Sequence, residues 1–150
     1  MEDIKIDSID VARHLMALLS ERDIGYGNIK IQKLLYIIYG AYLALYGEEA
    51  FSEEPRYFPY GPMFPRVYRQ MDKHKLTPLT VIFKKEHLNE VIEEVIEVFG
   101  EYTGRALSNW SHKEDSPWFK IKEQALPYNT PLDKLDIQRY FKKNVLKVTA

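Results

Sequence analysis

The sequence predicts a predominantly helical α+β fold, built as one compact domain of residues 1–150 around a buried central helix. Three observations support this prediction. No charged side chain occurs from Leu34 to Tyr46, amphipathic patterns of helical period surround this run, and two short stretches near Tyr57 and Leu79 favour extended structure. The length of 150 residues is typical of a single domain. We therefore expect smaller helices and a small two-stranded β element around the central helix.

The central helix is expected to span about residues 28–46. Apolar and aromatic residues lie on all its sides, which is typical of a helix that is buried all round. Asn28 is expected to cap its start, and Gly47 is expected to form a left-handed C-cap. The run is shorter than the roughly 20 apolar residues that a membrane span requires, so we expect no membrane association.

The composition narrows the class of protein. The chain has no cysteine, which excludes disulfides and thiolate metal sites and makes the cytoplasm the expected compartment. Residues 1–10 are acidic and lack the apolar core of a signal peptide. The net charge of −1 gives no electrostatic case for direct nucleic-acid binding, so none is expected, while eleven tyrosines favour a protein interface. We expect neither a cofactor nor a metal.

The segments beside the central helix are predicted from local signals. Asp7 or Ser8 can cap a first helix, and the glycines of residues 25–28 permit a turn before the central helix. After Gly47 the chain is acidic. This acidic segment is interpreted either as a solvated loop or as an edge that steers a basic partner; its carboxylates are Glu48, Glu49, Glu53 and Glu54.

The stretch from Pro55 to Met71 is unusually rich in proline and aromatic residues. Proline fixes its own φ and favours extended geometry in the residue before it, so a short strand and a rigid turn are predicted up to Pro62. Pro65 suits the first position of a helix. Basic side chains at i, i+3 and i+7 would then share one face of that helix, which is either a solvated surface or a binding site; they are Arg66, Arg69 and Lys73.

The second strand of the β element is expected at residues 79–83, paired with Tyr57 and Phe58, with a loop as the alternative. An amphipathic helix then begins near Leu88 and ends at Gly100, with valine, isoleucine and leucine on one face and glutamates on the other. Glutamates on a solvated face are not a catalytic pair without burial.

Three capping signals divide the C-terminal part of the chain. Thr103 can cap a short helix, Ser116 followed by Pro117 can start another, and residues 130–133 can open a last helix. His112 and Asp115 lie between two tryptophans and could form an acid–base pair. No nucleophile with a recognisable signature accompanies them, so we favour a structural role for this loop.

The order of four motifs resembles the Panacea domain, the family of SocA-like antitoxins. The motifs cover nearly the whole chain, from about residue 9 to Phe141. Three positions differ from the common pattern: Met63 and Phe64 replace small aliphatic residues, and Ser111 replaces threonine. The four motifs are the start of the central helix, a Tyr-Gly-Pro turn with the helix after it, a His…Pro-Trp loop and a final helix at residues 133–141. The matching positions in the first three are Asn28, Lys30, Gln32, Lys33, Leu34, Leu35, Tyr36, Tyr60, Gly61, Pro62, Pro65, Val67, Tyr68, His112, Pro117 and Trp118.

The resemblance implies a mainly helical fold and no enzymatic activity. It implies an antitoxin of a two-gene toxin–antitoxin system that neutralises a co-encoded protein toxin by direct binding. The expected toxin is one that blocks translation, such as an alarmone-synthetase-like enzyme. The alternative is a proteolytic adaptor that delivers a toxin, or another protein, to a cytosolic protease. A small hydrolase using His112 and Asp115 is the third and weakest hypothesis.

Two groups of residues are predicted to carry this function. Tyrosine, tryptophan and arginine dominate binding energy at interfaces, and the toxin-binding residues are predicted to be Tyr57, Tyr60, Met63, Phe64, Arg66, Tyr68 and Arg69. The alternative for Tyr60, Gly61 and Pro62 is that they only shape the turn. Gln32, Tyr36, His112 and Trp118 are expected to hold the loop on the central helix. They belong to the structural group, which is Asn28, Gln32, Lys33, Tyr36, Gly61, Pro62, His112, Pro117 and Trp118.

Overall fold

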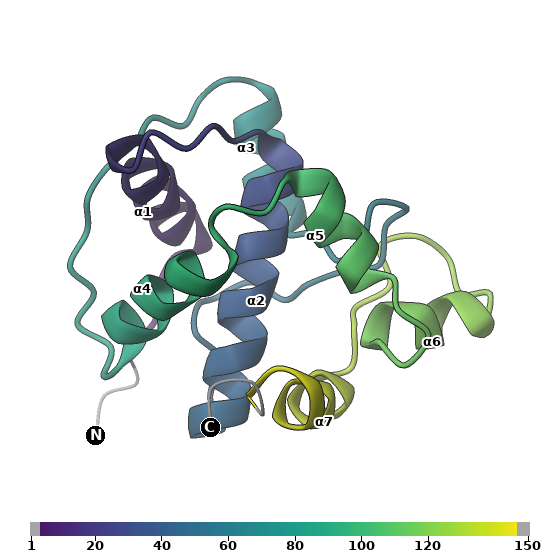
Figure 1. The fold of residues 1–150 in the computed structure, drawn as a ribbon. Helices are drawn as coiled ribbons and strands as arrows, with labels where there is room; N and C mark the ends of the chain where they lie inside the picture. Colours follow the sequence, from purple (N-terminus) through teal and green to yellow (C-terminus); the bar gives the residue numbers. More distant parts are fainter. Residues whose placement is uncertain (1–3, 147–150) are drawn as a thin grey trace.

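The computed structural model describes residues 4–146, and within this range the chain forms seven α-helices and no strand. Figure 1 shows α2 upright at the centre, with α1 and α4 on one side, α5 and α6 on the other, and α7 across its lower end. The helices are α1 (Ser8–Glu21), α2 (Asn28–Tyr46), α3 (Pro65–Asp72), α4 (Leu88–Phe99), α5 (Gly104–Ser111), α6 (Pro117–Glu123) and α7 (Lys134–Asn144).

The prediction of a buried central helix is confirmed. All residues of α2 from Lys30 to Ala44 are buried, and α2 contacts α1, α3, α4, α5 and α7. Gly47 forms the left-handed C-cap with φ of 71°, whereas the expected N-cap was wrong by one residue, because Gly27 occupies that position. Burial also stops before the last turn, where Leu45 and Tyr46 are exposed.

Most of the other helices begin where the capping residues in the sequence predicted. Asp7, Thr103 and Ser116 each accept a hydrogen bond from a backbone N–H in the first turn of their helix, as expected for N-caps. Asp133 does the same for α7, so this helix begins at Lys134, after the predicted signature. α4 ends at Phe99 with Gly100 as its C-cap, as expected, and Gly100 has right-handed geometry.

The prediction of a two-stranded β element was wrong. Within residues 4–146 only isolated bridges occur, and they join Arg56 to Met63 and Arg56 to Pro131. Prolines at positions 55, 59, 62 and 65 remove the donors that a longer ladder would need. Residues 79–83 do not pair with Tyr57 or Phe58. Instead, their backbone N–H groups donate to Arg13 O, His14 Nδ1 and Asn89 Oδ1.

Aromatic side chains join α7 and α5 to the central helix. The ring of Tyr36 lies edge-on to Phe141 with centroids 5.4 Å apart, and it contacts Trp110 at 6.3 Å. Gly40 leaves the space that the Phe141 ring fills, because a Cβ there would lie 2.3 Å from this ring. Among the described helices, none is long and apolar enough to cross a membrane.

Candidate functional site

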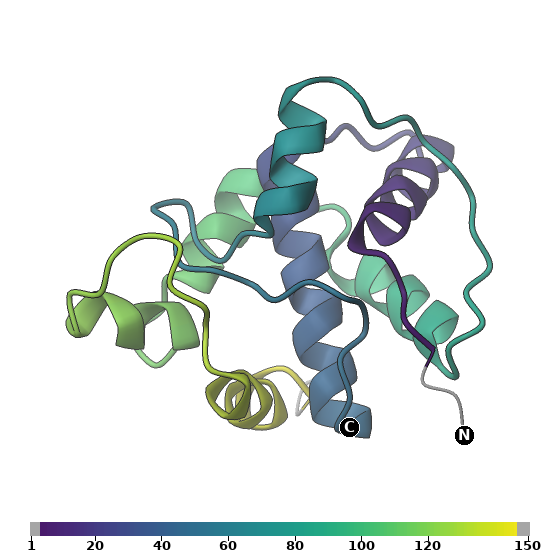
Figure 2. The same cartoon turned by 180° about the vertical axis from the view of Figure 1, so that it is seen from behind.

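The Tyr60 loop, defined here as residues 58–64, crosses the face of α2 beside α3 (Figure 2). Side chains from α2 hold one end of it. Nζ of Lys33 donates to Pro62 O at 2.9 Å, and Oε1 of Gln32 accepts from the backbone N–H of Phe64 at 2.7 Å. Since both α2 side chains are buried, these hydrogen bonds form away from water and fix the position of the loop.

Side chains from α5 and α6 hold the other end of the loop. Oγ of Ser108 donates to Tyr60 O at 2.6 Å, and Nε1 of Trp118 donates to Phe58 O at 2.7 Å. Gly61 sits between these anchors with φ of 106°, and a Cβ there would lie 2.3 Å from Ser111 Oγ. Only glycine adopts this conformation and this close approach without strain. The Tyr60 loop therefore contacts α5, α6 and α2 at one place.

Asn28 links the start of α2 to the helix that follows the loop. Its Nδ2 donates to Tyr68 O at 3.1 Å, and its Oδ1 accepts from Gln32 Nε2 at 3.1 Å. Gln32 in turn accepts from Phe64, so one chain of hydrogen bonds runs from α3 through α2 to the loop. Tyr36 belongs elsewhere, since its ring packs against Trp110 and Phe141.

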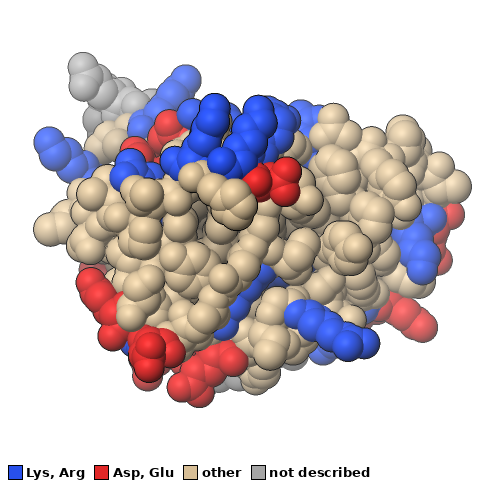
Figure 3. Space-filling model, turned by 90° about the horizontal axis from the view of Figure 1, so that it is seen from above, with Lys and Arg blue, Asp and Glu red and all other residues tan. Residues whose placement is uncertain are grey.

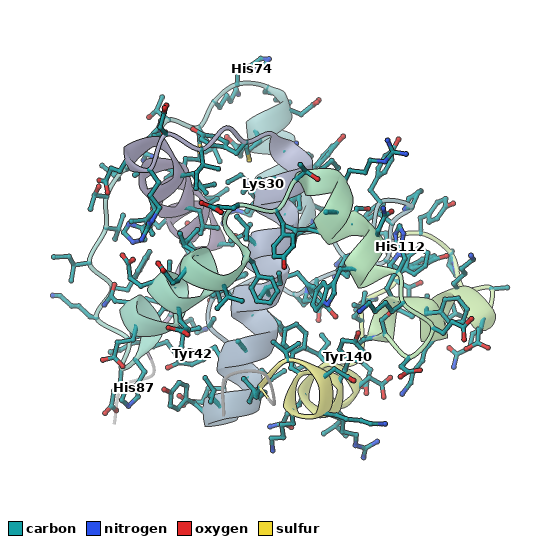
Figure 4. All side chains as sticks on the ribbon, viewed as in Figure 1. Lys30, Tyr42, His74, His87, His112 and Tyr140 are labelled. Atoms are coloured by element: carbon teal, nitrogen blue, oxygen red, sulfur yellow. The ribbon has the colours of Figure 1, made fainter. Side chains whose placement is uncertain are left out.

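His112 supports the loop through ring packing. Figure 4 shows it between α5 and α6, far from His74 and His87. Its ring centroid lies 4.0 Å from that of Trp118, and burial lowers the pKa of His112, an effect that the nearby charge of Lys33 increases. No hydrogen bond or ion pair joins His112 to Asp115 in the part of the chain that the structure describes. Within the same part, no three acidic or histidine side chains gather in a way that could hold a metal ion.

A shallow hollow of about 370 Å³ opens on the outer side of the Tyr60 loop. Tyr60 stands at its edge and is 62% exposed, although its backbone carbonyl is hydrogen-bonded. Aromatic and proline side chains make the hollow mainly apolar, and one guanidinium adds charge. Its lining residues are Phe58, Pro59, Tyr60, Met63, Pro65, Tyr68 and Arg69.

The structure brings together four of the seven predicted toxin-binding residues, namely Tyr60, Met63, Tyr68 and Arg69, around this hollow. The other three lie elsewhere. Phe64 is fully buried against Tyr39 and Phe51, and Tyr57 is buried against Trp118 and Tyr128. Arg66 is exposed, but its guanidinium pairs with Asp7.

Most of the acidic segment after Gly47 is engaged within the chain. Glu49 pairs with Lys134, and Glu54 pairs with Arg56 at 2.9 Å. Glu53 accepts hydrogen bonds from Ser8 Oγ at 2.7 Å and from the backbone N–H of Arg66 at 2.8 Å. These contacts satisfy carboxylates that a basic partner would otherwise meet.

Charge is distributed unevenly over the surface. Figure 3 shows lysine and arginine side chains gathered over α3 and acidic side chains gathered at the opposite edge, over α4. Within residues 4–146, neither Arg69 of α3 nor Lys73, which caps the C-terminus of α3, forms an ion pair, and both are exposed. The hollow beside the Tyr60 loop therefore adjoins a basic surface.

Sequence reasoning missed three residues of this site. Phe58 and Pro59 line the hollow, and they lie in the aromatic–proline stretch whose composition already marked it as unusual. Ser108 is different, because nothing in its sequence context indicates that its hydroxyl holds the Tyr60 carbonyl. That contact joins residues 48 positions apart and depends on the tertiary fold.

Comparison with known proteins gives two matches. The family profile described as "Antitoxin SocA-like, Panacea domain" matches residues 31–119, which include the loop, its α2 anchors and the His112–Trp118 segment. The protein "Antitoxin SocA" of Caulobacter vibrioides (strain NA1000 / CB15N) is 27% identical over 129 residues, covering 75% of this chain and 69% of that protein. No solved structure matches the chain.

Proposed function

The chain belongs to the Panacea-domain family of SocA-like antitoxins, and from this membership we propose that it neutralises a co-encoded protein toxin by direct binding at the hollow beside the Tyr60 loop. On the same basis, we propose that it does so without catalytic chemistry of its own. The family resemblance suggests a toxin that blocks translation, of the alarmone-synthetase kind. Binding would occur in the cytoplasm, where such a toxin acts.

The observation that carries this proposal is an exposed tyrosine on a firmly held loop. The Tyr60 side chain projects into solvent, while buried donors hold the carbonyls of Phe58, Tyr60 and Pro62. A loop that is already ordered loses little conformational entropy on binding. Exposed aromatic and arginine side chains around such a loop are typical of the residues that dominate interface energy.

The charge around the hollow suggests the chemistry of the toxin surface. Arg69 lines the hollow and Lys73 follows it one helical turn later, and neither forms an ion pair in the described part of the chain. We propose that the toxin presents an apolar projection next to carboxylates, because opposite charges steer and orient an encounter. The acidic segment after Gly47 is not part of the proposed toxin-binding surface, because most of its carboxylates are engaged within the chain.

Co-expression with the product of the adjacent gene tests the proposal. We expect growth arrest by that product alone, rescue by this chain, and a stable complex in a pull-down. Tyr60→Ala should weaken the complex by about 2 kcal/mol, or roughly thirtyfold, as for an aromatic hot spot. Arg69→Glu should weaken it further by reversing a charge at the same surface.

Matched control variants separate binding from general damage. Ile82→Ala removes an apolar side chain that is 86% exposed, and Arg139→Glu reverses an exposed charge on α7. Both lie outside the hollow and should leave the complex within about twofold of wild type. Equal loss of binding in Tyr60→Ala and Ile82→Ala would contradict the proposed surface, and absence of rescue would contradict the antitoxin function.

A second candidate function is that of an adaptor that delivers the toxin to a cytosolic protease. The observation that favours it is the presence of two chemically different surfaces, the basic one over α3 and the acidic one over α4 (Figure 3). An adaptor shortens the half-life of the toxin in cells, whereas an inhibitor leaves it unchanged. Toxin half-life after translation arrest, measured with and without this chain, distinguishes the two mechanisms.

A further inference from the structure

A second and larger depression lies on the side of α2 opposite α3. Figures 1 and 2 show α4 on one side of α2 and α3 on the other. We name this depression the α4 groove, and it has a volume of about 800 Å³, more than twice that of the hollow at Tyr60. The C-terminal half of α2, the outer edge of α4, Trp110 of α5 and the end of α7 form its walls.

The α4 groove contains several large apolar side chains that are exposed to solvent. Tyr102 is 54% exposed and Leu45 is 49% exposed, and Tyr46 and Val98 are also exposed. These four side chains come from α2, α4 and the segment that follows α4, and they line one groove. Clustered exposed apolar residues mark interaction sites more often than isolated ones do.

The shape of the groove indicates which secondary structure would enter it. Its long walls are the helices α2 and α4, so its floor follows helix surfaces. A partner strand would need a free sheet edge for its backbone hydrogen bonds, and the described residues contain no strand. An amphipathic helix needs only an apolar groove, because its own backbone is already hydrogen-bonded.

The rim of the groove is acidic on the α4 side. Glu90 and Glu94 line it one helical turn apart, and both are exposed. Glu90 lies 3.4 Å from His87, while Glu94 forms no ion pair with the residues that the structure describes. The opposing wall contributes a single lysine, Lys113. Glu93, in contrast, already forms an ion pair with Arg22, the C-cap of α1, at 3.2 Å.

We propose that the α4 groove binds an amphipathic helix of another protein, with apolar side chains at i, i+3, i+4 and i+7 and lysine or arginine along the edge that faces α4. The apolar side chains would cover Leu45, Tyr46, Val98 and Tyr102, and the basic ones would meet Glu90 and Glu94. A symmetric pair of copies fits less well, because a two-fold contact would bring the same acidic rims together. This proposal does not depend on toxin neutralisation at Tyr60.

A designed peptide tests the groove directly. The probe is a fluorescein-labelled 18-residue helix with leucine at i, i+3, i+4 and i+7 and lysine on both flanks. One control peptide carries glutamate in place of lysine, and another has the same composition with the leucines dispersed around the helix. Fluorescence anisotropy with the full chain should show at least about tenfold tighter binding of the probe than of either control.

Variants of the chain locate the binding site. Glu94→Lys and Val98→Ser should each weaken the probe about fivefold or more. Their matched controls, Glu123→Lys on α6 and Ile82→Ser, alter exposed residues outside the groove and should not change the affinity. Far-ultraviolet circular dichroism and thermal unfolding confirm that each variant is folded. Glu94→Lys should still capture the toxin, so the two proposed surfaces can fail independently.

Three results would overturn the proposal. In the first, the probe and the dispersed peptide bind equally well, or Glu94→Lys and Val98→Ser leave the affinity unchanged. In the second, light scattering shows a dimer that Val98→Ser dissolves, which would assign the groove to a second copy. In the third, deletion of residues 147–150 raises probe affinity tenfold or more, which would assign it to the chain's own C-terminal residues.

Discussion

Nζ of Lys33 lies 2.9 Å from the carbonyl oxygen of Pro62, and this contact joins the second turn of α2 to the loop that presents Tyr60. The lysine is fully buried, and no carboxylate pairs with it in the described part of the chain. Burial without a counter-charge disfavours the ammonium form and lowers the pKa of Lys33 to about 7. The loop is thus held by a lysine that changes charge near neutral pH.

The stability of the protein should therefore rise with pH in the neutral to mildly alkaline range. An unfolded lysine keeps its proton up to about pH 10.5, whereas folded Lys33 loses it near pH 7. Between these values the unfolded state binds more protons, so raising the pH favours the folded state. From pH 7 to pH 9 the gain should be on the order of 2 kcal/mol, measured by urea unfolding.

Lys33→Met is the matched variant for this pH dependence. It keeps the length of the side chain and removes the ionisable group, so most of the slope between pH 7 and pH 9 should disappear. The window ends at pH 9 because burial raises the pKa values of Tyr36 and Tyr39, which adds an opposite slope above about pH 10. An unchanged slope in Lys33→Met would show that Lys33 is not the titrating group.

Gly61→Ala should disrupt the loop rather than only lose a contact. The added Cβ would lie 2.3 Å from Ser111 Oγ and 2.8 Å from Lys33 Cε, at a φ of 106° that alanine rarely adopts. We expect a loss of about 2 kcal/mol or more in the free energy of unfolding, from strain and displacement together. Gly25→Ala is the control, since no atom lies within 4 Å of its added Cβ. Similar urea midpoints for the two variants would contradict this account.

Trp118→Phe should weaken toxin binding without touching the exposed surface of the hollow. The indole N–H is the donor to Phe58 O, and phenylalanine keeps an aromatic ring, although a smaller one, but leaves that carbonyl without its partner. We expect the free energy of unfolding to fall by about 1–2 kcal/mol. We also expect the affinity for the toxin to fall even where all of the variant is folded. Titration calorimetry at a temperature where the variant is fully folded measures the affinity. Wild-type affinity in this variant would show that the bond does not position the loop.

Gly40→Ala should separate α7 from the central helix. The new methyl group would lie 2.3 Å from the Phe141 ring, which is fully buried. Overpacking of this kind costs about 1–3 kcal/mol. The double variant with Phe141→Leu shortens the opposing side chain and should recover part of the loss. Additive losses in this double-mutant cycle, measured by thermal unfolding, would mean that the two residues do not compete for the same space.

Local sequence signals predicted the parts of the fold that local physics controls. The charge-free run predicted α2, because a helix that is apolar on all sides must be buried. Asp7, Thr103 and Ser116 predicted helix starts, because a capping side chain forms its hydrogen bond within the first turn of its own helix. Residues 79–83 were assigned wrongly for the opposite reason. Their β-branched composition suits a strand, but their backbone donors are taken by α1 and Asn89.

The candidate site was only half predictable. The aromatic–proline stretch was recognisable, but prolines remove the helical or strand period that would tell which aromatic side chains face outward. Tyr57 and Phe64 therefore could not be distinguished from Tyr60 and Tyr68 by sequence, although the first two are buried. The α4 groove was equally hidden, because it forms where residues from four distant helices meet.

The position of α2 has a consequence for how the protein is made. Residues that cover α2 come from both sides of it along the chain, and the last large one is Phe141, which packs against Tyr36. During synthesis, the ribosome releases α2 long before α7 has left the exit tunnel. The most apolar segment of the nascent chain therefore lacks its α7 cover while about a hundred further residues are made, or for roughly 5–20 seconds at ordinary elongation rates. We expect the newborn protein to depend on chaperones during this interval, and to complete its fold only after α7 has emerged.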